Sequence, residues 1–345
     1  MEPGTMACAV EPHAVELGTI ELKEREPPIR VLAVTPRPSS KGSMVHVTRQ
    51  VASLEAAGVT CQTFSVASRT SPWVVLREWR RLRREIDLFQ PDIVHAHYGT
   101  VTAFLAILST TLPVIITYRG SDLNPNRGRG CLREAFGIFL SQLSALRAAR
   151  IICVSKQLKG KLWWRRHRVS IIPTGVDMAV FYPRDLRQAR RELGWGPDER
   201  VVLFNAGDPI CKRLDLARTA VQFAESLCGR IQFAALDGNV SPNLIPTMMN
   251  AANCLLLTSD WEGSPNVVKE ALACNLPVVS VDVGDVRERL ELVWPSFIVP
   301  RDAREIGKAI CEILRQGQRS NGRELESDLS SEAISQRVVS LYRGL

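Results

Sequence analysis

Short apolar runs alternate with segments of helical periodicity along almost the whole chain, and this alternation restricts the fold more than any other feature. Apolar runs bounded by polar turns are typical of buried parallel strands, which need helical crossovers between them. The expected strands are 29–35, 59–66, 92–97, 113–118, 151–154, 169–172, 201–205, 231–235, 254–258, 277–281 and 297–299. The expected helices lie near 45–57, 73–89, 213–226, 265–274, 302–316 and 331–343, with another between 118 and 151.

The strand-and-helix series restarts after about residue 200, which predicts an α/β protein with two doubly wound, Rossmann-like domains. With 345 residues the chain can bury two cores. We divide it into a polar leader (1–28), an N-terminal domain (29–183), a C-terminal domain (184–329) and a last helical segment (330–345) that packs back on the first domain. Ligands bind beyond the carboxyl ends of such strands, so a central cleft between the domains is the expected site.

The net charge of +8 is distributed unevenly. Residues 27–183 contain 22 Lys and Arg against 8 Asp and Glu, whereas residues 184–345 contain 20 against 22. This asymmetry predicts an anionic partner for the first half alone. Arginine and tryptophan concentrate in 73–86 and 156–168, which suits an anionic membrane surface, nucleic acid or a plain solvated helix face. The residues alone leave these alternatives open.

Several other classes of protein and site are not expected. The longest apolar stretch, 101–117, is too short and too interrupted to span a membrane. The nine cysteines are scattered without a C-x-x-C pair, which indicates free thiols in a reducing cytosol. No D-x-D occurs, and we expect His95 and His97 to point to opposite faces of their strand. We therefore expect no metal site and no resident cofactor.

The segment 253–270 places an apolar strand, a polar loop and a helix in immediate succession. Ser264 is the expected N-cap and Pro265 the expected first helical residue. The free N–H groups at this helix end would face the cleft, where they suit an anion such as a phosphate.

Two carboxylates and a glycine accompany this helix end. Glu262 precedes the helix and Glu270 lies within it, so an anion at the helix end has one carboxylate on each side. Carboxylates accept hydrogen bonds from sugar hydroxyls. Gly263 lets a ligand approach the backbone closely. On physical grounds alone, a capped helix with a solvated glutamate explains the segment equally well.

Glu262 and Glu270, with seven residues between them, match the E-x7-E signature of the retaining GT-B glycosyltransferases of family 4. The chain resembles that family over about residues 29–345, including its other landmarks at 91–97, 172–177 and 205–208. The resemblance implies the GT-B fold and retaining transfer of a sugar from a nucleotide-diphosphate sugar to a glycan or lipid-linked acceptor. It places the nucleotide sugar on the C-terminal domain (184–329) and the acceptor on the N-terminal domain (29–183). It also implies a role in cell-surface polysaccharide biosynthesis at the cytoplasmic face of the membrane. It therefore favours an anionic membrane over nucleic acid as the partner of the basic N-terminal half.

The resemblance further implies roles for individual residues. Glu270 would bind the ribose of the donor, and Glu262 would contact the sugar near its anomeric carbon. Lys212 would neutralise the diphosphate leaving group. The remaining donor-binding residues implied in this way are Gly42, Ser43, Gly263, Ser264, Pro265, Asn266 and Val267, of which Asn266 and Val267 offer backbone N–H groups.

The chain departs from the family pattern in two places. Asp208 stands where the family usually has arginine, so Arg213 and Arg119 are the candidates for the second positive charge. Arg119 itself stands where many relatives have histidine, and we expect it to reach the sugar or a phosphate. Asp122 could orient an acceptor hydroxyl or bond a backbone turn, and both alternatives stay open. With Glu262, Arg119 and Asp122 form the candidate catalytic set.

Two other functions fit parts of the sequence. A nucleotide-sugar 2-epimerase of the GT-B fold would act on the donor without an acceptor. A nucleic-acid-binding α/β protein would use the basic N-terminal half.

Overall fold

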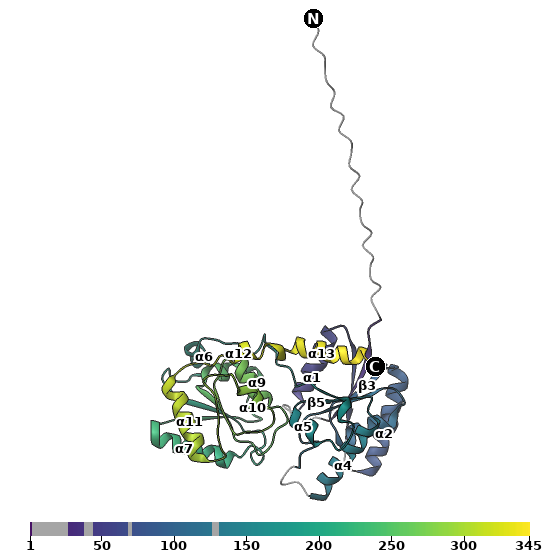
Figure 1. The fold of residues 1–345 in the computed structure, drawn as a ribbon, viewed down its shortest axis with the longest axis horizontal. Helices are drawn as coiled ribbons and strands as arrows, with labels where there is room; N and C mark the ends of the chain where they lie inside the picture. The colour runs from purple at the N-terminus through teal and green to yellow at the C-terminus, as the bar shows by residue number, and fades with distance from the viewer. Residues whose placement is uncertain (2–26, 38–43, 68–70, 126–130) are drawn as a thin grey trace.

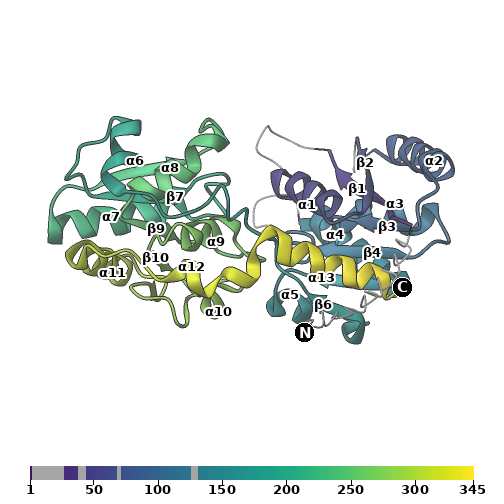
Figure 2. The ribbon, with the colours of Figure 1, turned by 90° about the horizontal axis from the view of Figure 1, so that it is seen from above.

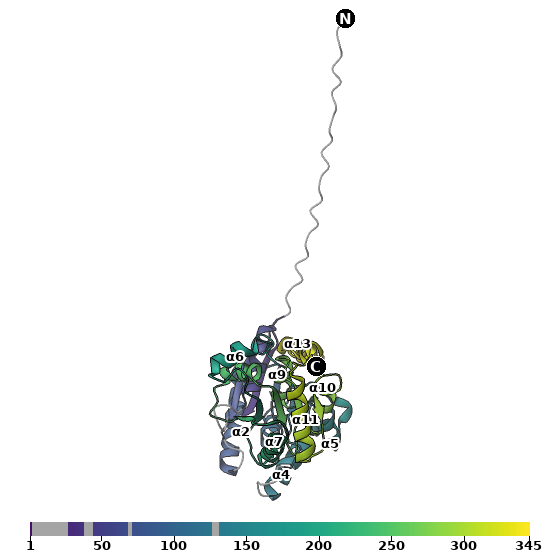
Figure 3. The ribbon, with the colours of Figure 1, turned by 90° about the vertical axis from the view of Figure 1, so that its left-hand side faces the viewer.

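The computed structural model describes residues 1, 27–37, 44–67, 71–125 and 131–345, which form two α/β lobes placed side by side (Figure 1). Seen from above, helix α13 (Ser331–Arg343) leaves the second lobe and lies along the first (Figure 2). Seen along the long axis, α7 (Leu214–Cys228) and α11 (Ala303–Gln316) of the second lobe lie nearest the viewer (Figure 3).

Each lobe is built on one fully parallel sheet. The first sheet has the spatial order β2-β1-β3-β4-β5-β6 and the second the order β11-β10-β9-β7-β8. The strands of the first are β1 (Arg30–Pro36), β2 (Thr60–Val66), β3 (Ile93–Ala96), β4 (Val114–Tyr118), β5 (Arg150–Cys153) and β6 (Val169–Ile171). The strands of the second are β7 (Val201–Asn205), β8 (Gln232–Leu236), β9 (Cys254–Leu257), β10 (Val278–Ser280) and β11 (Phe297–Ile298).

Helices cross from strand to strand in both lobes. The first lobe contains α1 (Val45–Ala56), α2 (Pro72–Phe89), α3 (Thr100–Ser109), α4 (Cys131–Arg147), α5 (Lys156–Lys161) and the 3₁₀ turn η1 (Arg166–Arg168). The second contains, besides α7 and α11, α6 (Leu186–Leu193), η2 (Pro242–Leu244), α8 (Ile245–Ala251), α9 (Asn266–Ala273), α10 (Val286–Leu290), α12 (Gly322–Leu325) and η3 (Ser327–Leu329). The fold is therefore the predicted pair of doubly wound domains, and the observed strand ends differ from the expected ones by at most one residue.

The two histidines at the end of β3 do not point to opposite faces, so that prediction was wrong. The rings of His95 and His97 stack with their centroids 3.9 Å apart, because residues two apart on a strand lie on the same face. His95 is fully buried and bonds the hydroxyls of Thr117 at 2.7 Å and Tyr342 at 2.6 Å. Burial, followed by the Arg119 guanidinium, lowers the pKa of His95 to about 3, so the ring is neutral.

The chain crosses between the lobes twice, and each crossing carries core residues with it. Val176 and Phe181 pack in the core of the second lobe, so the chain enters that lobe a few residues before the boundary that the charge distribution indicates. On its return, α13 packs against α1 and inserts Val338 and Tyr342 beside Val31 in the first lobe. Between these two crossings, the loops that follow the carboxyl ends of the strands in one sheet meet those of the other.

Candidate functional site

Three loops with glycine residues meet where the lobes face each other. Gly120 follows β4 in the first lobe, and Gly263 and Gly284 follow β9 and β10 in the second. A Cβ atom on Gly263 would lie 1.9 Å from the carbonyl oxygen of Arg119, and one on Gly284 would lie 3.0 Å from the oxygen of Gly263. The lobes thus touch backbone to backbone, and position 263 has no room for a side chain. The sequence predicted a close ligand here, but in this structure the close neighbour is the other lobe.

Helix α9 begins one residue later than predicted, at Asn266, with Pro265 in the N-cap position. The expected cap, Ser264, instead donates its hydroxyl to Oδ2 of Asp285 at 2.8 Å. The first N–H groups of the helix, on Asn266 and Val267, have no acceptor within the helix itself. Oδ1 of Asn266 is also buried without a hydrogen-bond partner among the described residues. The two N–H groups and the positive end of the helix dipole form a place for an anionic ligand, whereas Oδ1 of Asn266 accepts a hydrogen bond and suits a hydroxyl or N–H donor.

Glu262 is held within its own lobe. Its Oε1 accepts hydrogen bonds from Nζ of Lys212 at 2.5 Å and from the hydroxyl of Ser259 at 2.7 Å. Both charged side chains are mostly buried, at 16% exposed for Lys212 and 12% for Glu262. Burial lowers the pKa of Lys212, but the neighbouring Glu262 carboxylate more than offsets this and the pKa is raised overall. Lys212 is therefore a fixed positive charge next to Glu262.

Glu270 is held from the other lobe. Its Oε1 lies 3.2 Å from Nη1 of Arg49 on α1, and this ion pair crosses the gap between the lobes. Burial raises the pKa of Glu270, and the charges of Arg49 and Lys269 oppose that rise. Lys269 is itself buried and donates Nζ to the carbonyl oxygen of Thr174 at 2.7 Å. Burial lowers the pKa of Lys269 to about 8.

Basic groups from both lobes converge around this ion pair. The pKa of His46 on α1 is lowered first by burial and then by the charges of Arg119, Lys269 and Arg49. Nε2 of His46 is buried and has no hydrogen-bond partner among the described residues. A concentration of positive charge with unsatisfied polar atoms is what a diphosphate requires.

The guanidinium of Arg119 contacts side chains of its own lobe and of the segment that leaves it. It donates from Nη2 to Gln50 at 2.7 Å and from Nη1 to Thr174 at 3.1 Å, and it lies 3.2 Å from Nδ1 of His97. Burial lowers the pKa of Arg119 to about 10, against the opposing charge of Asp122. A direct contact of Arg119 with sugar or phosphate stays a prediction.

Asp122 takes the second of the two roles considered for it. Its oxygens accept from the backbone N–H groups of Gly99 at 3.1 Å, Arg119 at 3.0 Å and Gly120 at 2.9 Å. The side chain is completely buried. These contacts support the backbone-turn alternative for Asp122, and its place in the catalytic set stays a prediction. Its carboxylate stabilises the turn of the loop that carries Arg119 and Gly120.

Arg213 is engaged away from the paired carboxylates of the site. Its guanidinium binds Asp215 at 2.9 Å and Asp260 at 3.4 Å, and Asp260 also binds Arg301 at 3.1 Å. These pairs fix the loop before Glu262. Because its guanidinium is engaged in these pairs, Arg213 is a poor candidate for the second positive charge at the diphosphate.

The sequence analysis missed two cations that the structure brings to the site, Arg49 and Lys269. Lys269 had a signal, since it lies between the two glutamates of the signature. A weaker indication for Arg49 is its place in the first turns of the helix that follows the loop with Gly42 and Ser43, two of the implied donor-binding residues. Gly42 and Ser43 of that loop lie outside the described residues.

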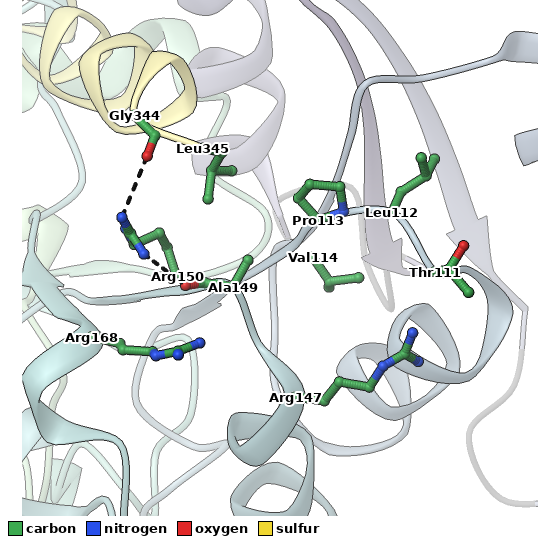
Figure 4. Close-up of a pocket in the computed structure, with 10 residues that line it drawn as sticks. All are labelled: Thr111, Leu112, Pro113, Val114, Arg147, Ala149, Arg150, Arg168, Gly344 and Leu345. Carbon is green, nitrogen blue, oxygen red and sulfur yellow. Dashed lines mark hydrogen bonds between the residues drawn. The ribbon is translucent and has the colours of Figure 1, made fainter.

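A separate cavity of about 440 Å³ opens at the amino ends of β4, β5 and β6, at the end of the first sheet opposite to these loops (Figure 4). Arg147, Arg150 and Arg168 line it, and none of its ten described lining residues has an acidic side chain. Each of the three guanidinium groups donates to backbone carbonyl oxygens. The cavity is basic but is not part of the site described above.

Within the part of the chain that the structure describes, no helix is long and apolar enough to cross a membrane.

Two family models match the chain. The model for Glycosyltransferase Family 4 matches residues 21–180. The model for Glycosyl transferases group 1 matches residues 200–316, which include the whole signature from Glu262 to Glu270. Together they span most of the chain.

Individual relatives are distant. The Bacillus subtilis (strain 168) glycosyltransferase TuaC, named for teichuronic acid biosynthesis, is 25% identical over 253 residues. That match covers 66% of this chain and 62% of TuaC, a little under two thirds of that protein's length.

Two solved structures share the fold over 92% of this chain and all of their own. Anabaena HepE, solved with UDP and glucose, has a TM-score of 0.71 at 16% identity. A UDP-GlcNAc 2-epimerase from Methanocaldococcus jannaschii has a TM-score of 0.60 at 11% identity. At such identities the likeness concerns the fold. With both halves matched by models of one enzyme family and the chain folded as such enzymes are, this protein belongs to the family 4 (group 1) glycosyltransferases of the GT-B fold.

Proposed function

We propose that this glycosyltransferase moves a sugar, with retention at the anomeric carbon, from a nucleotide-diphosphate sugar to a glycan or lipid-linked acceptor. One observation carries the donor assignment: Glu262 and Glu270 lie before and within α9, with the first N–H groups of that helix between them. The presence of UDP and glucose in the HepE structure supports a donor of this class.

The contacts of the site suggest how the donor binds. The ribose hydroxyls donate to Glu270, which is also paired with Arg49. The diphosphate lies at the N-terminus of α9, near Asn266 and Val267, and the transferred sugar faces Glu262. This cationic partner partly balances the charge of Glu270.

The proposed chemistry rests on stabilising the leaving group. When the bond between the anomeric carbon and the phosphate oxygen breaks, the diphosphate gains negative charge, which Lys212 and the end of α9 are positioned to stabilise. In a front-face reaction the acceptor hydroxyl attacks from the same side and gives its proton to the departing phosphate, so no side chain acts as base. We propose that these cations replace a divalent ion and that the reaction uses no resident cofactor.

The place of this reaction is also a proposal. The name of TuaC supports a role in cell-surface polysaccharide biosynthesis. The balance of 22 basic against 8 acidic residues in 27–183 supports an enzyme that works peripherally at an anionic membrane, on its cytoplasmic face.

Replacing Glu270 tests the donor site. We expect Glu270→Gln to raise the dissociation constant for the donor by about a hundredfold, because the amide accepts ribose hydroxyls less strongly than a carboxylate. Isothermal titration calorimetry against UDP-, GDP-, ADP- and TDP-sugars identifies the donor first. Glu312→Gln, on the surface of α11, serves as the matched control. Unchanged donor affinity in Glu270→Gln would overturn the assignment.

A nucleotide-sugar 2-epimerase is the second candidate, because the epimerase structure shares the fold over its whole length. Such an enzyme converts its donor without any acceptor. Incubation with the identified donor alone, followed by analysis of the sugar at C2, separates the two activities. A change of configuration at C2 would favour the epimerase, and intact donor would favour the transferase.

A further inference from the structure

Helix α4 exposes a continuous apolar stripe. The exposed fractions of its five members are 88% for Leu132, 59% for Phe136, 47% for Phe139, 37% for Leu143 and 38% for Leu146. Their spacing of three and four residues puts them on one face of the helix, over a length of about 21 Å. Large apolar groups gathered in this way are unusual on a surface that meets only water.

The stripe is additional to the face that α4 needs for folding. On its other side, Leu140 and Ala145 are buried, and Gln142 bonds the carbonyl oxygen of Lys161 and the backbone N–H of Trp163. The other exposed positions of α4 are Ala135, Arg133 near its start and Arg147 at its end. Among the described side chains of this helix, no acidic one is exposed.

Positive charge lies on both sides of the stripe. On one side α4 packs against α3 and α3 against α2, whose exposed arginines are Arg77, Arg80, Arg81, Arg83 and Arg84. On the other side stand Arg166, exposed, and the ring of Trp163, which is 56% exposed. Figure 1 shows α4 at the lower edge of the first lobe.

We infer that α4 is the surface by which this enzyme docks on an anionic lipid bilayer. The stripe enters the boundary between head groups and acyl chains, Trp163 lies at head-group level, and the flanking arginines meet lipid phosphates. The inference sharpens the membrane part of the proposed function, because it names an apolar helix that the sequence analysis did not single out. Basic residues alone would give only loose, salt-sensitive attraction.

The charges argue against a second copy of this chain as the occupant. If two stripes packed antiparallel, Arg133 of one copy would lie against Arg147 of the other, and no acidic side chain on the exposed face would compensate. Like charges at such contacts repel. The surface is thus complementary to an anionic partner and not to itself.

The stripe also lies on the first lobe, which we expect to bind the acceptor. The loop that carries Arg119 and Gly120 follows β4 directly, and α4 is the next helix along the chain. A lipid-linked acceptor in the same bilayer would therefore approach the lobe that holds α4.

Sedimentation with sucrose-loaded vesicles tests the inference on the full chain. We expect binding to vesicles of equal parts phosphatidylglycerol and phosphatidylcholine, and much weaker binding to pure phosphatidylcholine. Phe136→Ser with Phe139→Ser should weaken binding about a hundredfold, since two aromatic rings are lost from the inserted face. Phe136→Trp with Phe139→Trp should retain it. Leu227→Ser with Leu292→Ser removes exposed apolar groups of the second lobe (55% and 74% exposed) and should change nothing.

Arg80→Gln with Arg84→Gln examines the charged flank. We expect vesicle affinity to fall about tenfold and its dependence on salt to become weaker. Calorimetric donor binding is measured for every variant, so that a failure of the donor site is distinguished from a failure of docking.

Three results would overturn the inference. They are equal vesicle binding by wild type and Phe136→Ser/Phe139→Ser, wild-type binding to neither kind of vesicle, and a wild-type dimer in analytical ultracentrifugation that the double serine variant dissociates. Donor binding that stays normal in a variant that no longer binds vesicles supports it.

Discussion

The two lobes use their charged residues in different ways. In the second lobe, acids and bases are joined in short chains: Asp260 binds both Arg213 and Arg301, and Arg289 lies 3.1 Å from Asp285 and 3.7 Å from Glu326. In the first lobe, α2 carries exposed arginines around one buried acid, Glu78, which bonds Arg81 at 2.9 Å.

This difference separates two tasks. Pairing within the second lobe, which includes Lys212 with Glu262, holds the loop before α9 in place. A small ligand therefore meets this pair and the helix end. The exposed arginines of α2 contribute little to the stability of the fold and are available to a large anionic surface. If this distinction is correct, removing charges in the second lobe should affect catalysis and stability. Removing charges in the first lobe should mainly affect the binding of a partner.

The largest expected effect comes from the point where the lobes touch. Gly263→Val places side-chain atoms on the carbonyl of Arg119, where even a Cβ would lie at 1.9 Å, and so forces the loops apart. We expect kcat/KM to fall about a thousandfold or more, because small displacements between reacting groups are costly. Gly238→Val is the control, since nothing lies within 4 Å of a Cβ there. Activity within a few fold of wild type would mean that this contact is not needed for the reaction.

The next largest effect concerns the charge within the second lobe. Lys212→Gln removes the cation beside Glu262 and should lower kcat about a hundredfold, with a smaller change in KM, because the leaving diphosphate loses its stabilising charge. Steady-state kinetics with the identified donor gives both constants. Lys308→Gln, in an exposed pair with Glu305, should leave them unaltered. A change confined to KM would assign Lys212 to ground-state binding instead.

A pH effect on stability follows from Glu326, the buried carboxyl group that lies 3.7 Å from Arg289. Burial raises the pKa of Glu326 from 4.5 to about 7, so between these values the folded protein binds more protons than the unfolded one. Stability should then decrease as the pH rises through this window, by at most about 3 kcal/mol from this group. Urea unfolding of Glu326→Gln at about pH 5 and pH 8 should show a smaller pH dependence than wild type. Equal dependence in both proteins would contradict the assignment.

The smallest effect is expected in the first lobe. Arg80→Gln with Arg84→Gln should alter the free energy of unfolding by less than about 0.5 kcal/mol, because both side chains are exposed on α2. Thermal unfolding at low and high salt measures this directly. A loss of several degrees in Tm would show that these arginines support the fold, and the contrast between the lobes would then fail.

The features predicted correctly from the sequence are those that depend on residues close together in the chain. The strands follow from apolar runs, and Glu262, Glu270 and the helix between them lie within a few residues of each other. Lys212 came from the family resemblance, and the structure joins it to Glu262. The prediction of Ser264 as the cap failed because its hydroxyl has a better partner in Asp285, which lies on another loop.

Contacts between the lobes could not be predicted in this way. The pairing of Arg49 with Glu270 spans 221 positions and depends on how two separately folded sheets meet. The same holds for the carbonyl of Arg119 against Gly263. For Asp122, the sequence permits both a ligand contact and a turn, and only the positions of three backbone N–H groups decide between them.

The return of α13 to the first lobe has a consequence for biosynthesis. The apolar face formed by Val31, Ile93 and Ile115 is covered by side chains of this helix, and His95 bonds the hydroxyl of Tyr342. Those residues leave the ribosome after the entire second lobe. The lobe translated first therefore completes its packing last, and in the interval an apolar patch of its sheet stays open to chaperones or to misassociation.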